Sequence, residues 1–340
     1  MHRLLIALLV AGSLALGLIP VVSAQSGAIQ ANAAQAHLAA AKVAAGTDHP
    51  GLFDRICTPG AVTGGATAAA RAGGAPPPPP APPAPPPASG WHAEPAKVFD
   101  NLYFVGMTEY SAWAITTSQG IILVDALFDY SVEDEVVNGL KKLGLDPAQI
   151  KYVLISHAHT DHAGGAKLLQ QRFGSRVILS AADWDMLDRQ NPSWKPKRDM
   201  VATDGQKLTL GDTTLTMYIT PGHTSGTIST LIPVKDNGRT HLAAAWGGTA
   251  FNFGPNAAIF KSYIASSERF RDIVVKSGAD VLIANHTNFD GTKTKLPALA
   301  KRKAGDPHPY VIGNDSIKRY LTVANECAQA ALAGLPGATN

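Results

Sequence analysis

The chain has 340 residues, and its 29 lysines and arginines against 26 aspartates and glutamates give a formal net charge of +3 at pH 7. This near balance argues against a polyanionic partner such as nucleic acid, and the densest basic stretch, Lys301-Arg302-Lys303, is typical of a solvated helix end. The length fits two domains, or one α/β domain with appended segments.

The first 24 residues are typical of a secretory signal peptide. Arg3 follows the start, a long apolar run comes next, and Val22-Ser23-Ala24 supplies small residues for cleavage. An uncleaved membrane anchor is the alternative, although glycine and proline interrupt the run and its length is marginal for a span. We therefore expect an exported protein, periplasmic or secreted, with no membrane span once residues 1–24 are removed.

Two accessory segments follow the signal peptide. We expect residues 25–72 to form an N-terminal helical extension, because the alanine-rich residues 27–46 predict a helix with few large side chains to bury. Residues 73–90 carry ten of the 24 prolines and predict a stiff linker, since proline is excluded from helix interiors and central strands. Binding to a proline-recognising domain is an alternative role for this linker. The main folded domain is expected over residues 91–340.

From Trp91 onward, short β-like runs alternate with amphipathic helices. The first half is predicted to contain the strands VFDNLYFVG, SAWAITT and IILVDAL, a helix capped by Ser131 that ends at Gly144, a strand at 152–155, a helix at 166–173 and a strand at 176–180. The second half is predicted to contain hairpins around Gly211-Asp212 and Asn237-Gly238, a helix through 273–276 and a strand at 280–284. Two β-rich halves with helices predict two sheets packed face to face and helices outside.

The stretch VLISHAHTDHAGG places three histidines and an aspartate directly after a buried strand. Imidazole nitrogens and a carboxylate are donors suited to zinc. Because so tight a loop cannot easily direct all four side chains to one tetrahedral ion, we expect His157 and His159 to bind one metal and Asp161 and His162 a second. A chance gathering of polar loop residues is the alternative, but the clustering at one strand end makes it improbable.

Two further histidines lie at strand ends. His223 follows the strand LTMYI within TPGHT, and His286 follows DVLIA. Either one taken singly is as readily structural, but the cluster above favours both as metal ligands. Three other histidines are expected to be structural or exposed: His92, His241 and His308.

The motifs H-A-H-T-D-H, P-G-H-T and A-N-H-T resemble the signature of the metallo-β-lactamase superfamily over roughly residues 96–292. The resemblance implies an α/β (α+β) fold, a four-layer αββα sandwich, for the domain at 91–340. The export signal, the alanine-rich helix and the phrase FDNLYFVG…SAWAITTSQGIILVDAL are most similar to subclass B3 enzymes. That resemblance implies two Zn²⁺ ions, one held by His157, His159 and His223, the other by Asp161, His162 and His286.

One segment distinguishes subclasses of this superfamily. Related hydrolases such as glyoxalase II place a metal-bridging aspartate after the second hairpin, and the cysteine-using subclasses place a thiolate there. Here Trp246-Gly247-Gly248-Thr249-Ala250 offers neither a carboxylate nor a thiol. This favours the subclass without a protein bridge, although its frequent serines are replaced by Gly-Gly-Thr, so that contacts to the substrate carboxylate are expected to differ.

The resemblance implies a zinc-dependent hydrolase in which a zinc-bound hydroxide opens the amide of a small-molecule β-lactam antibiotic, with Asp161 orienting the hydroxide. No Ser-x-x-Lys motif offers a serine nucleophile. Thr249 and Ser225 are candidates to bind the substrate carboxylate and Trp113 is a candidate to wall the pocket, although packing is the stronger interpretation for each.

Several alternatives remain open on the sequence alone. A periplasmic lactonase or another metallo-hydrolase would use the same metals, and a zinc-binding protein without turnover belongs to a different class. The two cysteines, Cys57 and Cys327, either form a disulfide in an oxidising compartment or pack as unpaired thiols. We expect a monomer.

Overall fold

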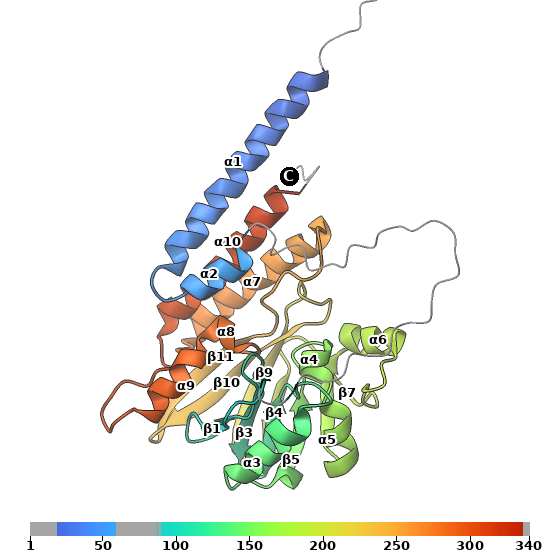
Figure 1. Cartoon of the computed structure of the whole chain (residues 1–340), viewed down its shortest axis with the longest axis vertical. Coiled ribbons are helices and arrows are strands. Elements are labelled where there is room, and N and C mark those ends of the chain that lie inside the picture. Colours follow the sequence, from blue (N-terminus) through green and yellow to red (C-terminus); the bar gives the residue numbers. More distant parts are fainter. Residues whose placement is uncertain (1–18, 59–86, 88–89, 336–340) are drawn as a thin grey trace, which may run out of the picture.

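The computed structural model describes residues 19–58, 87 and 90–335. Two sheets lie face to face and helices cover their outer faces, which gives four layers (Figure 1). This arrangement confirms the prediction of an αββα sandwich. Most of the predicted signal peptide and most of the proline-rich linker lie outside the described residues.

The first sheet has seven strands in the order of the sequence. They are β1 (Ala96–Lys97), β2 (Leu102–Phe104), β3 (Trp113–Thr117), β4 (Gly120–Val124), β5 (Ile150–Leu154), β6 (Arg176–Ser180) and β7 (Met200–Ala202). Strands β1 to β4 pair antiparallel, and β4 to β7 pair parallel. Helices cover its outer face: η2 (Glu133–Val137), α3 (Asn138–Lys142), η3 (Pro147–Gln149), α4 (Thr160–Ala163), α5 (Ala166–Phe173) and α6 (Ala181–Gln190). The parallel half directs its carboxyl ends to one edge of the sandwich.

The second sheet has five strands in the order β12-β11-β10-β9-β8. They are β8 (Lys207–Leu210), β9 (Thr213–Ile219), β10 (Ile228–Asp236), β11 (Arg239–Trp246) and β12 (Val281–Ala284). The two predicted hairpins, β8–β9 and β10–β11, are confirmed, and β12 pairs parallel to β11. Its flanking helices are α7 (Ala257–Ser277), α8 (Thr287–Asp290), α9 (Thr292–Ala300) and α10 (Asn314–Ala333).

Strand β4 shows how the apolar pattern builds the layers. Its side chains alternate between the two faces of the sheet. Ile121 and Leu123 pack with the helices on the outer face, whereas Ile122 and Val124 pack between the two sheets. A strand buried on both faces reads as a continuous apolar run, as IILV does here.

The helix expected to start at Ser131 forms, but Ser131 does not cap it. The Ser131 hydroxyl donates to the Phe128 carbonyl at 3.4 Å instead of accepting from the helix, and a π-helical turn over Glu133–Val137 precedes α3. The sequence prediction of an N-cap was therefore wrong, because the buried hydroxyl bonds back into the preceding turn.

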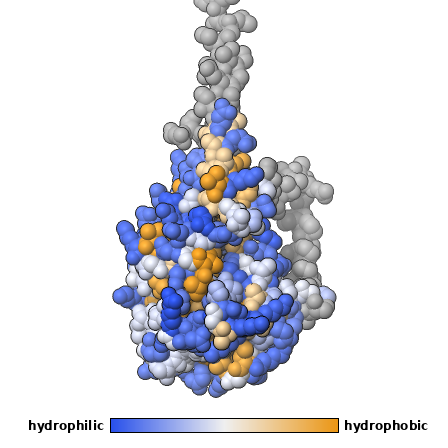
Figure 2. Space-filling view, turned by 90° about the vertical axis from the view of Figure 1, so that its left-hand side faces the viewer, coloured by the Kyte–Doolittle hydropathy of each residue, from blue (hydrophilic) through white to orange (hydrophobic). Residues whose placement is uncertain are grey.

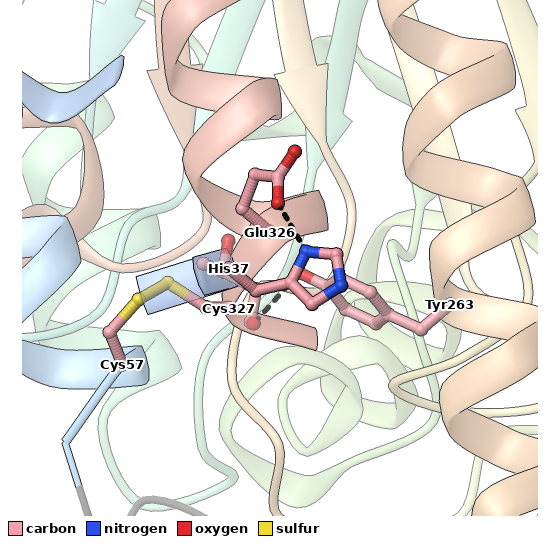
Figure 3. The surroundings of a disulfide bond; sticks show 6 residues. His37, Cys57, Tyr263, Glu326 and Cys327 are labelled. Carbon is pink, nitrogen blue, oxygen red and sulfur yellow. Dashed lines mark hydrogen bonds and ion pairs between the residues drawn. A yellow bond between two sulfur atoms is a disulfide. The ribbon is translucent and has the colours of Figure 1, made fainter. Parts of the chain in front are cut away.

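The N-terminal extension is bound to the sandwich through the last helix. Helix α1 (Ile19–Ala45) runs alongside α10, and Ala41 and Ala45 are buried against it (Figure 1). Helix α2 (Pro50–Ile56) ends at Cys57, which forms a disulfide with Cys327 of α10 (Figure 3). The disulfide that the sequence left open is thus present, and beside it His37 pairs with Glu326 at 2.7 Å.

On the face drawn in Figure 2, hydrophilic residues dominate and hydrophobic ones occur in small, separate groups. None of the described helices combines the length and the hydropathy that crossing a bilayer would need.

Candidate metal centre

Three loops at one edge of the sandwich carry the predicted ligands. The loop after β5 and the short helix α4 supply four of them, the loop between β9 and β10 supplies His223, and His286 follows β12 as the first residue before α8. Because these strands end at the same edge, residues more than 120 positions apart in the sequence meet there. The structure gathers them into two groups: His157, His159 and His223, and Asp161, His162 and His286.

The first group consists of three imidazole nitrogens. His223 Nε2 lies 3.0 Å from His157 Nε2 and 3.1 Å from His159 Nδ1. Ligands about 2.0–2.1 Å from a tetrahedral zinc ion stand about 3.3 Å from one another, so these separations fit three corners of such a site.

The second group consists of two imidazole nitrogens and a carboxylate. His162 Nε2 lies 3.2 Å from His286 Nε2 and 3.1 Å from Asp161 Oδ2, and the third side of the triangle, from His286 Nε2 to Asp161 Oδ2, is 3.5 Å. This geometry and donor set fit a second divalent ion. The grouping is the one that the sequence resemblance implies.

Backbone carbonyls fix which ring nitrogen of the first group faces the metal position. His157 donates from Nδ1 to the Gly247 carbonyl at 2.9 Å, and His223 donates from Nδ1 to the Ala250 carbonyl at 2.7 Å. Since a carbonyl only accepts, each ring presents an unprotonated Nε2 to the group. Residues 246–250, which lack an acid, therefore still support the site, because their carbonyl oxygens orient two of its histidines.

Burial keeps most of these imidazoles neutral. Burial and the neighbouring histidines hold the pKa of His157 well below its usual value. Burial, aided by the charge of His159, lowers the pKa of His223 to about 3. Burial, aided by the charge of His162, lowers the pKa of His286 to about 3 as well. Neutral imidazole is the form that binds a metal.

His162 differs from the other histidines because carboxylates flank it. Burial alone would lower its pKa, but Asp161 and Asp125 raise the pKa of His162 to about 10. In turn, although burial opposes ionisation of Asp161, His162 and His286 hold the pKa of Asp161 below its usual range. A metal ion bound here would displace the proton from His162.

Asp125, which the sequence analysis did not single out, supports the ligand loop from β4. Its Oδ2 lies 3.0 Å from His162 Nδ1, an ion-pair distance, and its two oxygens accept hydrogen bonds from the backbone and hydroxyl of Ser156 at 2.7 and 2.9 Å. Asp125 also adopts a positive φ of 63°. It therefore orients a ligand and fixes the start of the histidine loop.

Asp183 joins two ligand loops from the first turn of α6. It is fully buried, and its Oδ2 accepts hydrogen bonds from the backbone of Ala158 at 2.8 Å and from the Thr224 hydroxyl at 2.9 Å. Ala158 lies between His157 and His159, and Thr224 directly follows His223. Asp183 thereby ties together the loops that make up the first group.

Two cavities open beside the ligand groups. One, of about 280 Å³, is lined by Asp161 and His286 together with Arg55, Glu109 and Tyr110. The other, of about 380 Å³, is lined by His159 and includes Ser225. His223 lines both cavities, so they flank the metal position from two sides.

The three predicted substrate contacts fall in different environments. Ser225 is exposed and lines the larger of these cavities. Thr249 is 1 % exposed and hydrogen-bonded to the Tyr320 hydroxyl, and Trp113 is 2 % exposed between the sheets, where its indole donates to the Ala284 carbonyl. The burial of Thr249 and Trp113 does not fit the substrate contacts suggested from sequence, because neither side chain reaches the two cavities.

Three histidines outside the two groups have structural partners, as expected from the sequence. His92 pairs with Glu135, His241 pairs with Asp280, and His308 donates to the Val98 carbonyl.

Comparison with known proteins gives a consistent family. The family model described as "Metallo-beta-lactamase superfamily" matches residues 106–237. A hydroxyacylglutathione hydrolase of Acidiphilium cryptum is 36 % identical over 106 residues, which cover 31 % of this chain and 37 % of that enzyme. An N-acyl homoserine lactonase of a Bacillus species is 29 % identical over 153 residues, which cover 42 % of this chain and 59 % of the lactonase. The chain thus spans less than two thirds of the length of these two relatives.

The similarity to solved structures extends further along the chain. BJP-1, a subclass B3 metallo-beta-lactamase of Bradyrhizobium japonicum, superposes with a TM-score of 0.60 at 27 % identity and covers 67 % of this chain and 89 % of its own. The FEZ-1 metallo-beta-lactamase of Legionella gormanii superposes with a TM-score of 0.58 at 27 % identity and covers 67 % and 91 %. The family match spans the histidine motifs and the structural neighbours are subclass B3 enzymes, so this chain has the fold of the metallo-beta-lactamase superfamily.

Proposed function

We propose that the protein is a zinc-dependent hydrolase of the subclass B3 type that opens the ring amide of β-lactam antibiotics. The observation that carries the proposal is a pair of three-ligand groups to which residues 246–250 add neither an acid nor a thiol. The structural similarity to BJP-1 and FEZ-1 supports the same substrate class.

When bound, divalent ions at the two groups would acidify a water molecule and polarise the carbonyl of the substrate. The chain's own residues prepare this chemistry. Asp161 is one-fifth exposed and lines the smaller cavity, so its carboxylate is placed both to hold a metal and to accept a proton beside it. Three of the other five ligands, His157, His162 and His223, are buried, which keeps their geometry fixed before a substrate arrives.

Aromatic side chains give the cavity an apolar wall. The Tyr110 ring lies 5.0 Å from the His286 ring and 5.0 Å from Phe128, which stacks on Tyr130 at 4.9 Å between ring centres. Tyr110 lines the cavity beside Asp161. Such a wall suits a substrate with an apolar body next to a reactive carbonyl.

A lactonase is the second candidate function. The observation that favours it is the sequence match to N-acyl homoserine lactonases, one of which is aligned over 42 % of this chain. Both functions need attack on the carbonyl of a small ring, so the metal groups alone do not distinguish them.

We also propose that the enzyme works in the periplasm or outside the cell. The Cys57–Cys327 disulfide supports this, because disulfides persist in oxidising compartments.

The test is turnover by the purified protein of nitrocefin, a carbapenem and an acyl-homoserine lactone, with and without EDTA, together with metal analysis. We expect β-lactam hydrolysis that EDTA abolishes and close to two zinc ions per chain. His157→Ala should abolish turnover, whereas His92→Ala, which removes a histidine outside both groups, should retain it. Turnover of the lactone alone would replace the first function with the second, and a zinc-loaded protein inert on every substrate would indicate a binding protein without turnover.

A further inference from the structure

We propose that Arg55, contributed by the N-terminal extension, binds an anionic group of the substrate and sets a preference for carboxylate substrates. The proposal rests on the hydrolase function above. Arg55 lies in α2 and is exposed, and it lines the 280 Å³ cavity together with Asp161 and His286 of the second ligand group. It lies outside residues 106–237, the part that matches the family model, so the family match does not include this feature.

Arg55 forms no ion pair among the described residues, although its charge attracts the nearby Glu109 carboxylate. The acidic neighbour in the same cavity, Glu109, is already engaged, because one carboxylate oxygen accepts from Lys293 and the other from Asn288. The other carboxylate in the lining, Asp161, pairs with His162 at 3.1 Å. The guanidinium therefore keeps its donors for a ligand.

Arg55 is the single lysine or arginine among the described residues that line this cavity. A guanidinium presents donors in a planar fork that matches a carboxylate. Arg55 shares this lining with Asp161 and His286 of the second ligand group. A carboxylate held by Arg55 would thus lie beside the second ligand group.

The rest of the cavity supports this orientation. Tyr110 and Phe289 supply apolar surface, and Asn252 supplies a polar side chain. Thr249, a contact suggested from sequence for the substrate carboxylate, is buried, bonded to Tyr320 and absent from the cavity lining. Arg55 is therefore better placed than Thr249 to hold an anion.

The fold holds Arg55 on a rigid support rather than on a free arm. Two residues after it, Cys57 is joined to α10 by the disulfide, and Leu52 and Ile56 of the same short helix are buried in the core beneath α10. Helix α2 also packs against α8, which begins directly after His286. The backbone that carries Arg55 therefore loses little freedom when the side chain binds a ligand.

The experiment compares a β-lactam that carries a free carboxylate with its methyl ester. We expect Arg55→Ala to lower kcat/KM for the carboxylate by about tenfold to a hundredfold, chiefly through KM, as is typical for loss of a hydrogen bond to a charged group. The kcat/KM for the ester should fall much less, so the ratio of kcat/KM for the carboxylate to that for the ester should fall strongly. Arg55→Lys should restore part of the ratio. Arg239→Ala removes an exposed arginine at the far end of β11 and should leave the ratio at its wild-type value.

A second readout does not depend on turnover. Phenylacetate, a carboxylate with an apolar ring, should bind the zinc-loaded wild-type protein more tightly than the zinc-loaded Arg55→Ala variant in a calorimetric titration. If the wild type hydrolyses neither lactam, the proposed function fails, whereas weaker phenylacetate binding by the variant would still support the role of Arg55. If the variant keeps both the wild-type selectivity ratio and wild-type phenylacetate binding, the inference about Arg55 is overturned.

Discussion

Gly248 lies directly against the side chain of His223. A Cβ atom at position 248 would come within 2.4 Å of His223 Cβ and 2.7 Å of its Cγ, and one at Gly247 would come within 1.9 Å of the Ile228 carbonyl oxygen. Within residues 246–250, which offer no acid or thiol, positions 247 and 248 therefore also have no room for a side chain. Steric fit explains why two glycines stand here.

We expect Gly248→Ala to displace His223 and weaken the first ligand group. His223 Nε2 stands 3.0 to 3.1 Å from its two partners, so a shift of a few tenths of an ångström changes the ligand geometry. Zinc analysis and turnover should show lowered occupancy and a rate at least about tenfold lower. The control is Gly51→Ala, at a helical glycine where an added Cβ meets nothing within 4 Å. Full occupancy and full rate in Gly248→Ala would contradict this account.

Asp183 is expected to control zinc affinity without touching the metal. Asp183→Ala removes the acceptor shared by Ala158 and Thr224, so the loops that carry the first ligand group lose their common anchor. Loss of such a supporting contact typically weakens metal binding by about tenfold to a hundredfold. Competition with a chromogenic chelator measures the affinity.

Two further variants separate the hydrogen bonds from the bulk and charge of Asp183. Asp183→Asn keeps an oxygen that accepts from both donors and should retain most of the affinity. Asp185→Ala changes an exposed residue of the same helix and should leave the affinity unchanged. Equal losses in the Ala and Asn variants would instead indicate that the negative charge matters.

The six residues that the structure gathers into two groups could be selected from the sequence because each belongs to a local pattern, a polar residue placed after a buried strand. Asp125 carries the same signal after IILV but stands alone, so nothing nearby marked it out. Asp183 follows Ser180 by three residues, and Ser180 accepts from the Asp183 backbone at 3.3 Å, so the local pattern indicates only a helix cap.

The position of Arg55 at the cavity could not be predicted from the sequence, for a different reason. It lies about 100 residues before the first ligand, in a segment whose composition indicated only an accessory helix. Its position at the cavity depends on the pairing of Cys57 with Cys327 and on the packing of α2 against α8, which are contacts between distant parts of the chain. Patterns over a few residues contain no information about such contacts.

The Cys57–Cys327 disulfide should contribute to both stability and selectivity. It joins residues 270 positions apart, and its loss in the Cys57→Ser/Cys327→Ser variant should lower the free energy of unfolding by about 2–4 kcal/mol. Urea denaturation with and without a reductant measures this, and a reductant should weaken the wild type but not the variant. The variant should also lose part of the carboxylate preference, because α2 is then held by packing alone. An unchanged free energy of unfolding would show that packing suffices.

The pair of Arg302 and Asp236 should make stability depend on pH in the acid range. The guanidinium donates to both carboxylate oxygens at 2.8 and 2.7 Å, and this hydrogen bonding holds the pKa of Asp236 below its usual value. A lowered folded-state pKa contributes stability above the unfolded value of about 3.9, and that stability is lost as the pH falls through the folded-state pKa. Asp236→Asn should therefore cost about 1 kcal/mol at pH 7.

Urea denaturation at pH 7, 5, 4 and 3 distinguishes this electrostatic effect from a loss of packing. The difference between the wild type and Asp236→Asn should be constant from pH 7 to 5, shrink from about pH 4 and continue to shrink at pH 3, since Asp236 becomes protonated in both states. Asp188→Asn, at a more exposed carboxylate paired with Lys195 and Arg198, should give a smaller difference at every pH. A difference for Asp236→Asn that stays constant down to pH 3 would mean that the side chain stabilises the hairpin by its shape and not by its charge.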